Sequence, residues 1–419
     1  MTTDMPDLEE YRNAVRAWLE GNLERRPDAE AGRRGSEDKT PGEIAESRVL
    51  QRKLFDSGYA GISYPRAYGG QGLTPSHERV FREESRRYKV PDFGGAGHVM
   101  FGAIGRSMLA HGSPEFLQRY IAPLLKGEEL WCQFYSEPEA GSDLAGIRTR
   151  AVRDGDHWVI TGSKIWSTGA HHADYAMCLA RTDWGAPKHR GLTWFAIPTH
   201  APGVTVRPIR QINGQTGFCE SFLDDVAVAG DAVIGEVNQG WSVAQTMLVY
   251  ERGAGESGGL VEPRNLAPDL VALARKAGRA DDPVVRQALA RAHINDYAQF
   301  HLGRRIVARL QLSDRPEAAI AAYGKLAAGT LSPIRARIGI EVGGAEALVW
   351  AGEDAETAAR PAVGYLNGRM ASIAAGTNEM QRNGIGERVL GLPREPSFDS
   401  RKPFSEVMRD ARTWDGRVG

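Results

Sequence analysis

The hydrophobic period changes twice along this chain, and the two changes constrain the fold more than any other feature. Apolar residues first recur with helical spacing, as between residues 8 and 19. They then alternate as in strands, and afterwards helical spacing returns over an alanine-rich stretch. We therefore predict an α+β chain. Its predicted parts are an N-terminal α-helical domain at 1–127, a middle β-domain at 128–235, a helical domain at 236–393 and a loosely held tail at 394–419.

The clearest local signal lies at residues 152–160, which predict a strand, a turn at Asp154-Gly155 and a second strand. Further strands are expected from Tyr175, Leu192 and Val204, where apolar residues alternate. In the last third, the pattern predicts long helices over about 283–313 and 316–339.

Composition and charge exclude several classes of protein. The 419 residues carry a net charge of -1 with scattered cations, which gives no reason to expect nucleic acid or a membrane surface as partner. The three cysteines lack metal or disulfide spacing, so we expect buried thiols in a reducing cytoplasm. No signal peptide and no run of eighteen apolar residues is present. His171 and His172 have no partner at ligand spacing, so no metal is expected.

Two runs carry the candidate chemistry. Residues 131–143 read Trp-Cys-Gln-Phe-Tyr-Ser-Glu-Pro-Glu-Ala-Gly-Ser-Asp, and residues 164–169 read Lys-Ile-Trp-Ser-Thr-Gly. Each run alone is weak evidence for a binding site, because a Gly-Ser-Asp sequence usually forms only a turn. Together they offer backbone donors, small hydroxyls and a large flat wall in Trp166. This combination suits a planar ligand with a polar edge and an anionic tail.

In this order and at this separation, the runs resemble the middle domain of the acyl-CoA dehydrogenase family, which carries aromatic-x-x-[Ser/Thr]-Glu-Pro-x-Ala-Gly-Ser-Asp and Lys-x-Trp-[Ile/Ser]-Thr. The resemblance implies an N-terminal helical domain, a middle β-barrel-like domain and a C-terminal four-helix bundle, with FAD as cofactor. It also implies that Ser142 lies along the substrate. The flavin-binding residues that it implies are Gln133, Tyr135, Ser136, Gly141, Trp166, Ser167, Thr168, Gly376, Thr377 and Glu379.

Removing hydrogens from the Cα–Cβ bond of a thioester requires a base, a hydride acceptor and donors to the carbonyl oxygen. Most relatives carry the base as Glu in Tyr-Glu-Gly-Thr, where this chain has Ala375. A minority place it in a Glu-Arg pair after the β-domain, and Glu251-Arg252 matches that pair. We therefore predict Glu251 as the base. The resemblance also implies that the backbone N–H of Ala375 is the oxyanion donor, while Arg252 either supports CoA or the base, or forms only a structural salt bridge.

Three interpretations remain open from the residues. The first is an FAD-dependent acyl-CoA dehydrogenase that passes electrons to an electron-transferring flavoprotein. The second is a flavin oxidase or monooxygenase, or an enzyme acting on carrier-protein thioesters, and the third is a non-catalytic subunit. The family resemblance favours a homotetramer or a heterotetramer with a related subunit. The usual Arg-x-x-Phe-Gly run is missing from 258–282, and Gly253, Gly255, Gly258 and Gly259 predict a roomy acyl pocket.

Overall fold

The computed structural model describes residues 5–27, 38–251, 267–312, 318–348, 361–397 and 399–413. Arg252 and the four glycines between 253 and 259 lie outside the described residues. The chain divides into two compact units. The first comprises Met1–Arg210, Thr216–Tyr250 and Pro396–Gly419, and the second comprises Gln211–Gln215 and Glu251–Glu395.

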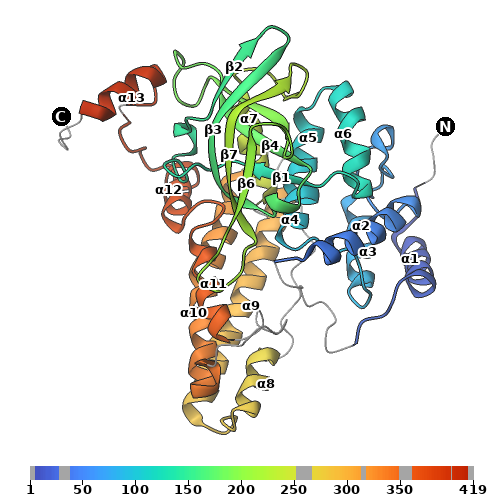
Figure 1. Cartoon of the computed structure of the whole chain (residues 1–419). Helices are drawn as coiled ribbons and strands as arrows, with labels where there is room; N and C mark the ends of the chain where they lie inside the picture. Colours follow the sequence, from blue (N-terminus) through green and yellow to red (C-terminus); the bar gives the residue numbers. More distant parts are fainter. Residues whose placement is uncertain are drawn as a thin grey trace. The chain divides into compact units, whose positions relative to one another are not determined.

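The N-terminal part of the first unit is helical, as predicted (Figure 1). Asp7 caps α1, and the helix buries Tyr11, Val15 and Leu19 along one face. Ser113 caps α6 through a bond from the Phe116 N–H, with proline following at the first helical position. The elements are α1 (Leu8–Asn22), α2 (Pro41–Asp56), α3 (Pro75–Ser85), α4 (Gly95–Gly97), a π-helix (His98–Ile104), α5 (Gly105–His111) and α6 (Pro114–Lys126).

The middle part of the same unit is a mixed eight-stranded sheet. Its order is β6-β7-β3-β2-β4-β5-β8, and β1 pairs in parallel with β4 off this path. Strands β4 and β5 are buried on both faces, so their apolar residues are almost continuous rather than alternating. The strands are β1 (Trp131–Phe134), β2 (Arg150–Asp154), β3 (His157–Thr168), β4 (Tyr175–Arg181), β5 (Leu192–Pro198), β6 (Val204–Ile209), β7 (Phe218–Ala229) and β8 (Val233–Ile234).

The predicted hairpin forms between β2 and β3, but its turn lies one residue later than expected. Asp154 pairs with His157, so the two-residue loop is Gly155-Asp156 rather than Asp154-Gly155. Gly155 adopts φ +60°, a conformation that glycine reaches without steric cost. The glycine therefore occupies the first position of the loop.

Helix α7 (Gly240–Glu251) is tied to the sheet at two points. The indole Nε1 of Trp194 on β5 donates to the carbonyl of Gly240 at 2.8 Å. The hydroxyl of Tyr135, which directly follows β1, donates to the carbonyl of Ala244 at 3.0 Å. Both bonds are buried, so they fix the helix that ends at Glu251.

The second unit is built around helix α10. Arg335 on α10 pairs with Asp269 on α8 at 2.8 Å and with Asp296 on α9 at 3.0 Å, which joins three helices. Helix α10 ends at Gly343, four residues beyond the predicted end, and Gly344 follows it at φ +58°. Among the described helices, none is long and apolar enough to cross a membrane. The unit contains α8 (Pro268–Lys276), α9 (Pro283–Leu312), α10 (Ala321–Gly343), α11 (Pro361–Asn367) and α12 (Asn378–Arg388).

The segment after Pro393 differs from the expected loose tail. It contains helix α13 (Phe404–Thr413), and Phe404 is only 2% exposed. The polar composition of this stretch favoured a tail, although Phe404, Val407 and Met408 fall at helical spacing. The expectation is therefore wrong for these residues of the first unit.

We expect Trp194→Phe to lower the free energy of unfolding by about 1 kcal/mol more than Trp158→Phe. Both changes delete the same atoms from a buried indole, but Trp158 Nε1 has no partner among the described residues. The difference between the two losses in unfolding free energy therefore measures the contribution of the hydrogen bond from Trp194 to α7. Urea denaturation of the two variants measures it, and equal losses would contradict the assigned bond.

Candidate active site

A buried ion pair joins the two motif runs. Lys164 Nζ lies 3.0 Å from Glu137 Oε1 and also donates to the carbonyl of Tyr135 at 3.1 Å. Lys164 is completely buried. A second link is the backbone N–H of Ile165, which donates to the carbonyl of Ser136 at 2.9 Å. The run at 131–143 and the run at 164–169 are thus held side by side in the first unit.

The carboxylate of Glu137 is fully engaged within the protein. It accepts the backbone N–H groups of Arg148 at 2.7 Å and Thr149 at 2.9 Å as well as the ammonium of Lys164. Burial raises the pKa of Glu137, but Lys164 and these hydrogen bonds outweigh burial and leave the pKa below its usual value. This glutamate therefore holds the architecture together and is not available as a catalytic base.

Trp166 presents its ring outward from a β-bulge. Between Lys164 and Ser167, β3 carries one more residue than its partner β7, and Trp166 adopts φ +63°. A bulky residue in this region is strained, so the surrounding ladder must hold it there. Its side chain is 54% exposed and meets Phe218 edge-on at 6.0 Å. The result is a broad apolar face suited to stacking on a planar ring.

The polar groups beside this wall fit the edge of a flavin. Gln133 Oε1 and Ser167 Oγ are buried atoms without a hydrogen-bond partner among the described residues. Unpaired buried polar atoms are uncommon and call for a partner such as a ligand. Thr168 and Ser136 contribute half-buried hydroxyls from the same two runs, while the hydroxyl of Tyr135 is already bonded to α7. The donor and acceptor set present therefore fits FAD.

The turn at Gly141 and Ser142 is open. A methyl group added at Gly141 would meet no atom within 4 Å, and Ser142 is exposed. The next residue, Asp143, is anchored by Lys188 Nζ at 2.9 Å. Backbone donors here are accessible to an elongated polar ligand.

In the second unit, Ala375 and Gly376 form a left-handed step before α12. Their φ angles are +53° and +92°. The hydroxyl of Thr377 then caps the helix by accepting the Met380 N–H. The buried side chain of Gln381 donates to the carbonyl of Gly376 at 3.2 Å, with Ala375 at 3.5 Å. With both carbonyls turned toward Gln381, the loop has a fixed course in which the Ala375 N–H has a defined direction.

The remaining predicted residues lie as follows. Glu251 is the final residue of α7 and is half-buried, but it belongs to the second compact unit. Glu379 lies exposed in the first turn of α12, where its own backbone N–H and the Thr377 hydroxyl lower its pKa. The predicted flavin residues from 133 to 168 lie together in the first unit, and those from 376 to 379 lie together in the second.

Sequence reasoning assigned no role to Gln381, Glu137 or Lys164. A charged lysine in the middle of an otherwise half-buried strand was the one available signal for the ion pair. Nothing in the sequence pattern distinguished Gln381 from its exposed neighbours on α12.

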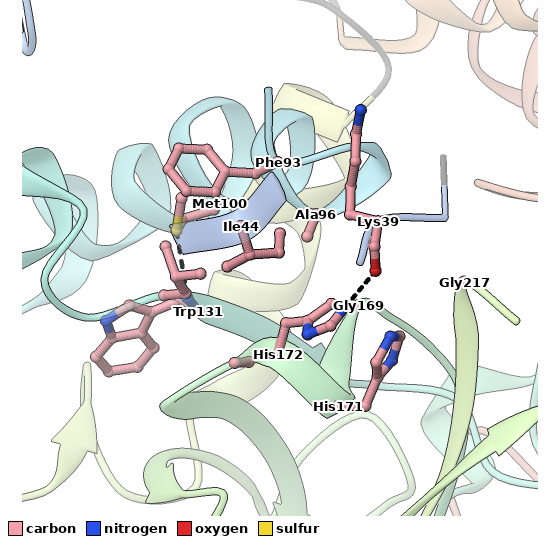
Figure 2. Close-up of a pocket in the computed structure, with 12 residues that line it drawn as sticks. Lys39, Ile44, Phe93, Ala96, Met100, Trp131, Gly169, His171, His172 and Gly217 are labelled. Carbon is pink, nitrogen blue, oxygen red and sulfur yellow. Dashed lines mark hydrogen bonds between the residues drawn. The ribbon is translucent and has the colours of Figure 1, made fainter. Parts of the chain in front are cut away.

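A small pocket in the first unit contains the two histidines (Figure 2). His172 Nε2 bonds to the carbonyl of Lys39 at 2.7 Å, and His171 Nδ1 lies 3.1 Å from Cys219 Sγ. Burial and the neighbouring imidazole lower the pKa of His171. Among the described residues there is no group of three or more side chains placed to hold a metal ion. The cysteines Cys132, Cys178 and Cys219 are buried and unpaired, as predicted.

Comparison with known families identifies the class of protein. The chain matches the acyl-CoA dehydrogenase N-terminal domain over residues 5–128, the middle domain over 132–226 and the C-terminal domain over 238–390. The chain therefore belongs to the acyl-CoA dehydrogenase family and is an acyl-CoA dehydrogenase. This confirms the family resemblance, the enzyme class and the three-domain fold class that the motifs implied.

Individual relatives cover nearly the whole chain. Acyl-CoA dehydrogenase IpdE1 of Mycobacterium tuberculosis is 36% identical over 396 residues, covering 93% of this chain and 99% of the relative. Among solved structures, the Tcur3481-Tcur3483 steroid ACAD aligns with a TM-score of 0.76 at 31% identity, covering 93% of this chain and 98% of that one. The ChsE4-ChsE5 complex from Mycobacterium tuberculosis gives a TM-score of 0.70 at 25% identity, with coverage of 94% and 100%.

We expect Lys164→Met to lower the free energy of unfolding by about 3 kcal/mol, because it leaves Glu137 buried without its cation. The double change with Glu137→Gln should cost less than the sum of the single changes, by roughly 1–3 kcal/mol. Urea denaturation at neutral pH measures both quantities. Lys89→Met, which breaks the exposed pair with Glu46, is the control and should cost well under about 1 kcal/mol.

The same pair predicts a pH dependence. Because folding lowers the pKa of Glu137, its stabilisation is present above the usual glutamate range and is lost as pH falls through the lowered value. The stability gap between wild type and Lys164→Met should therefore narrow on acidification. A gap independent of pH would argue against the pair.

Proposed function

We propose that this enzyme desaturates the Cα–Cβ bond of an acyl-CoA thioester, with Glu251 as the base that removes the α-proton. The observation that carries the proposal is the pair of runs locked by Glu137 and Lys164, which leaves the Trp166 face and unpaired buried oxygens for a flavin. FAD, when bound, supplies the acceptor for the β-hydride. We also propose the domain limits 1–127, 128–235 and 236–393 predicted from the sequence as the working division of the chain before the C-terminal segment.

Glu251 is the better candidate for the base because the alternative position has no carboxylate. Residue 375 is alanine, and Glu137 is bound internally by three donors. Glu251 ends a helix whose position is fixed by two buried hydrogen bonds, which favours the precise placement that proton transfer requires. Arg252 is proposed to support the CoA portion or the base.

The thioester carbonyl is proposed to accept a hydrogen bond from the backbone N–H of Ala375. A backbone donor survives the loss of the glutamate side chain, and Gln381 holds the step that directs it. Charge that develops on the carbonyl oxygen would then meet a fixed dipole that needs no rearrangement. This accounts for a left-handed alanine where most side chains would be strained.

FAD binding is supported by the first unit. We propose that Trp166 stacks on the flavin ring system. The side chains proposed to form hydrogen bonds with the polar edge of the flavin are Gln133, Ser136, Ser167 and Thr168. Gly141, Tyr135, Gly376, Thr377 and Glu379 are the further proposed contacts. The reduced enzyme is proposed to pass electrons to an electron-transferring flavoprotein.

A bulky, ring-bearing acyl group is the proposed substrate class. The steroid ACAD aligns with almost the whole chain at 31% identity. A π-helix interrupts the helical region at His98–Ile104, and an added methyl group at Gly102 within it would meet nothing within 4 Å. Single π turns are frequent at functional sites.

The two named neighbours are each designated by a pair of chains, which supports a heterotetramer over a homotetramer.

We expect Glu251→Gln to slow anaerobic flavin reduction by on the order of a hundredfold or more, the range for a lost general base. The amide keeps size and hydrogen bonding, so substrate should still bind and perturb the flavin absorption band. Ala375→Glu in that background should restore part of the rate, since most relatives carry the carboxylate there. Stopped-flow spectroscopy follows both, and unchanged reduction in Glu251→Gln would place the base elsewhere.

We also expect ring-bearing acyl-CoAs to give the highest kcat/KM in an anaerobic panel that includes short straight-chain and branched thioesters. A preference for short straight chains would refute the proposed substrate class. Rapid reoxidation by air, with oxygen incorporated into product, would instead support an oxidase or monooxygenase.

A further inference from the structure

The C-terminal segment of the first unit is attached to the loop between β4 and β5 (Figure 1). The backbone N–H of Phe404 donates to the carbonyl of Ala186 at 2.9 Å, and that of Ser405 donates to Trp184 at 2.9 Å. Pro403 forms a bridge with Pro187. Although α13 is short, its first turn is therefore paired to the loop as an added strand would be.

Phe404 covers a buried cation. The guanidinium of Arg181 lies 3.7 Å from the centre of the Phe404 ring, within cation–π range. Arg181 is fully buried and donates to the carbonyls of Ala145, Ile147 and Lys188. Burial lowers the pKa of Arg181 to about 10. The phenyl ring thus shields a residue that bonds both to the loop after Asp143 and to the β4–β5 loop.

Lys188 joins the two regions directly. Its ammonium bonds to Asp143 at 2.9 Å on one side and to Asp399 on the other, and its side chain is only 11% exposed. Burial lowers the pKa of Lys188, but the bonds to Asp399 and Asp143 outweigh it and leave the pKa above its usual value. Asp143 directly follows Ser142 in the open turn. The C-terminal segment therefore reaches this turn through one lysine.

We propose that residues 399–405 form a strap that positions the Gly141-Ser142-Asp143 turn for the CoA portion of the substrate, with Lys188, Asp399 and Phe404 as positioning residues. The inference rests on the proposed function and on the position of Ser142 along the substrate that the family resemblance implies. The side chain of Asp143 is otherwise 61% exposed, so the Lys188 bridge restrains a turn that solvent would leave mobile. The strap affects binding of the CoA portion of the substrate and does not act on the reacting Cα and Cβ atoms.

The test compares an acyl-CoA with its truncated N-acetylcysteamine thioester, which lacks the chain and nucleotide that the turn would hold. We expect Lys188→Met and Phe404→Ala to raise KM for the acyl-CoA about tenfold, equivalent to about 1.4 kcal/mol of binding. The kcat should stay within about twofold, and kcat/KM for the truncated thioester should not change. Lys188→Arg, which keeps the cation, should recover most of the affinity.

Asp410→Asn is the matched control, because it breaks the exposed pair with Lys402 at a residue of the same segment that lies outside the strap. It should leave both substrates unaffected. If Lys188→Met and Phe404→Ala lowered kcat/KM equally for the two thioesters, or for neither, the strap would not be a positioning device. It would then be only a stabilising contact.

Calorimetry with CoA alone separates this inference from the proposed function. If wild type oxidises neither thioester, the proposed function fails, and the strap is judged by binding. A dissociation constant for CoA about tenfold weaker in Lys188→Met, with N-acetylcysteamine binding unchanged, would then support it. Equal affinity in the two proteins, or no binding by wild type, would overturn it.

Discussion

The buried pair between Lys164 and Glu137 is the interaction on which the site depends. An unpaired charge at either position would be strongly destabilising in the interior, so each residue requires the other. The pair forms only when the run after β1 lies against the middle of β3 in one register. Folding the core of the middle domain and assembling the proposed flavin surface are therefore the same event.

Backbone strain recurs where the proposed chemistry occurs. Trp166 and Ala375 both adopt positive φ, at a cost of order 1–3 kcal/mol each. Their surroundings hold them by different means: a bulge in a long ladder for Trp166, and the side chain of Gln381 for Ala375. In both cases the strained residue carries the group proposed to meet a ligand, the ring face of Trp166 or the N–H of Ala375, which a relaxed backbone would direct elsewhere.

The features that could be predicted from the sequence are those set by local hydrophobic period and by short motifs. The helical, alternating and helical blocks, the hairpin at 152–160 and the two runs from 131 to 169 were visible because their signals are short in range. The Asp399–Lys188–Asp143 bridge was not, since it joins residues more than 200 positions apart that show no pattern. Burial of Phe404 was missed for a different reason: Phe404, Val407 and Met408 do fall at helical spacing, but the largely polar stretch around them was interpreted as a tail.

The exchange of glutamate for alanine at residue 375 separates two functions that relatives combine in one residue. If the side chain alone mattered, loss of the glutamate would leave no reason to keep a left-handed step, and a relaxed turn would be more stable. Here Ala375 and Gly376 both adopt positive φ, Thr377 returns to an extended conformation and caps α12, and Gln381 braces the step. This braced step is consistent with the proposed role of the Ala375 backbone N–H toward a carbonyl oxygen, with the proposed base on another helix.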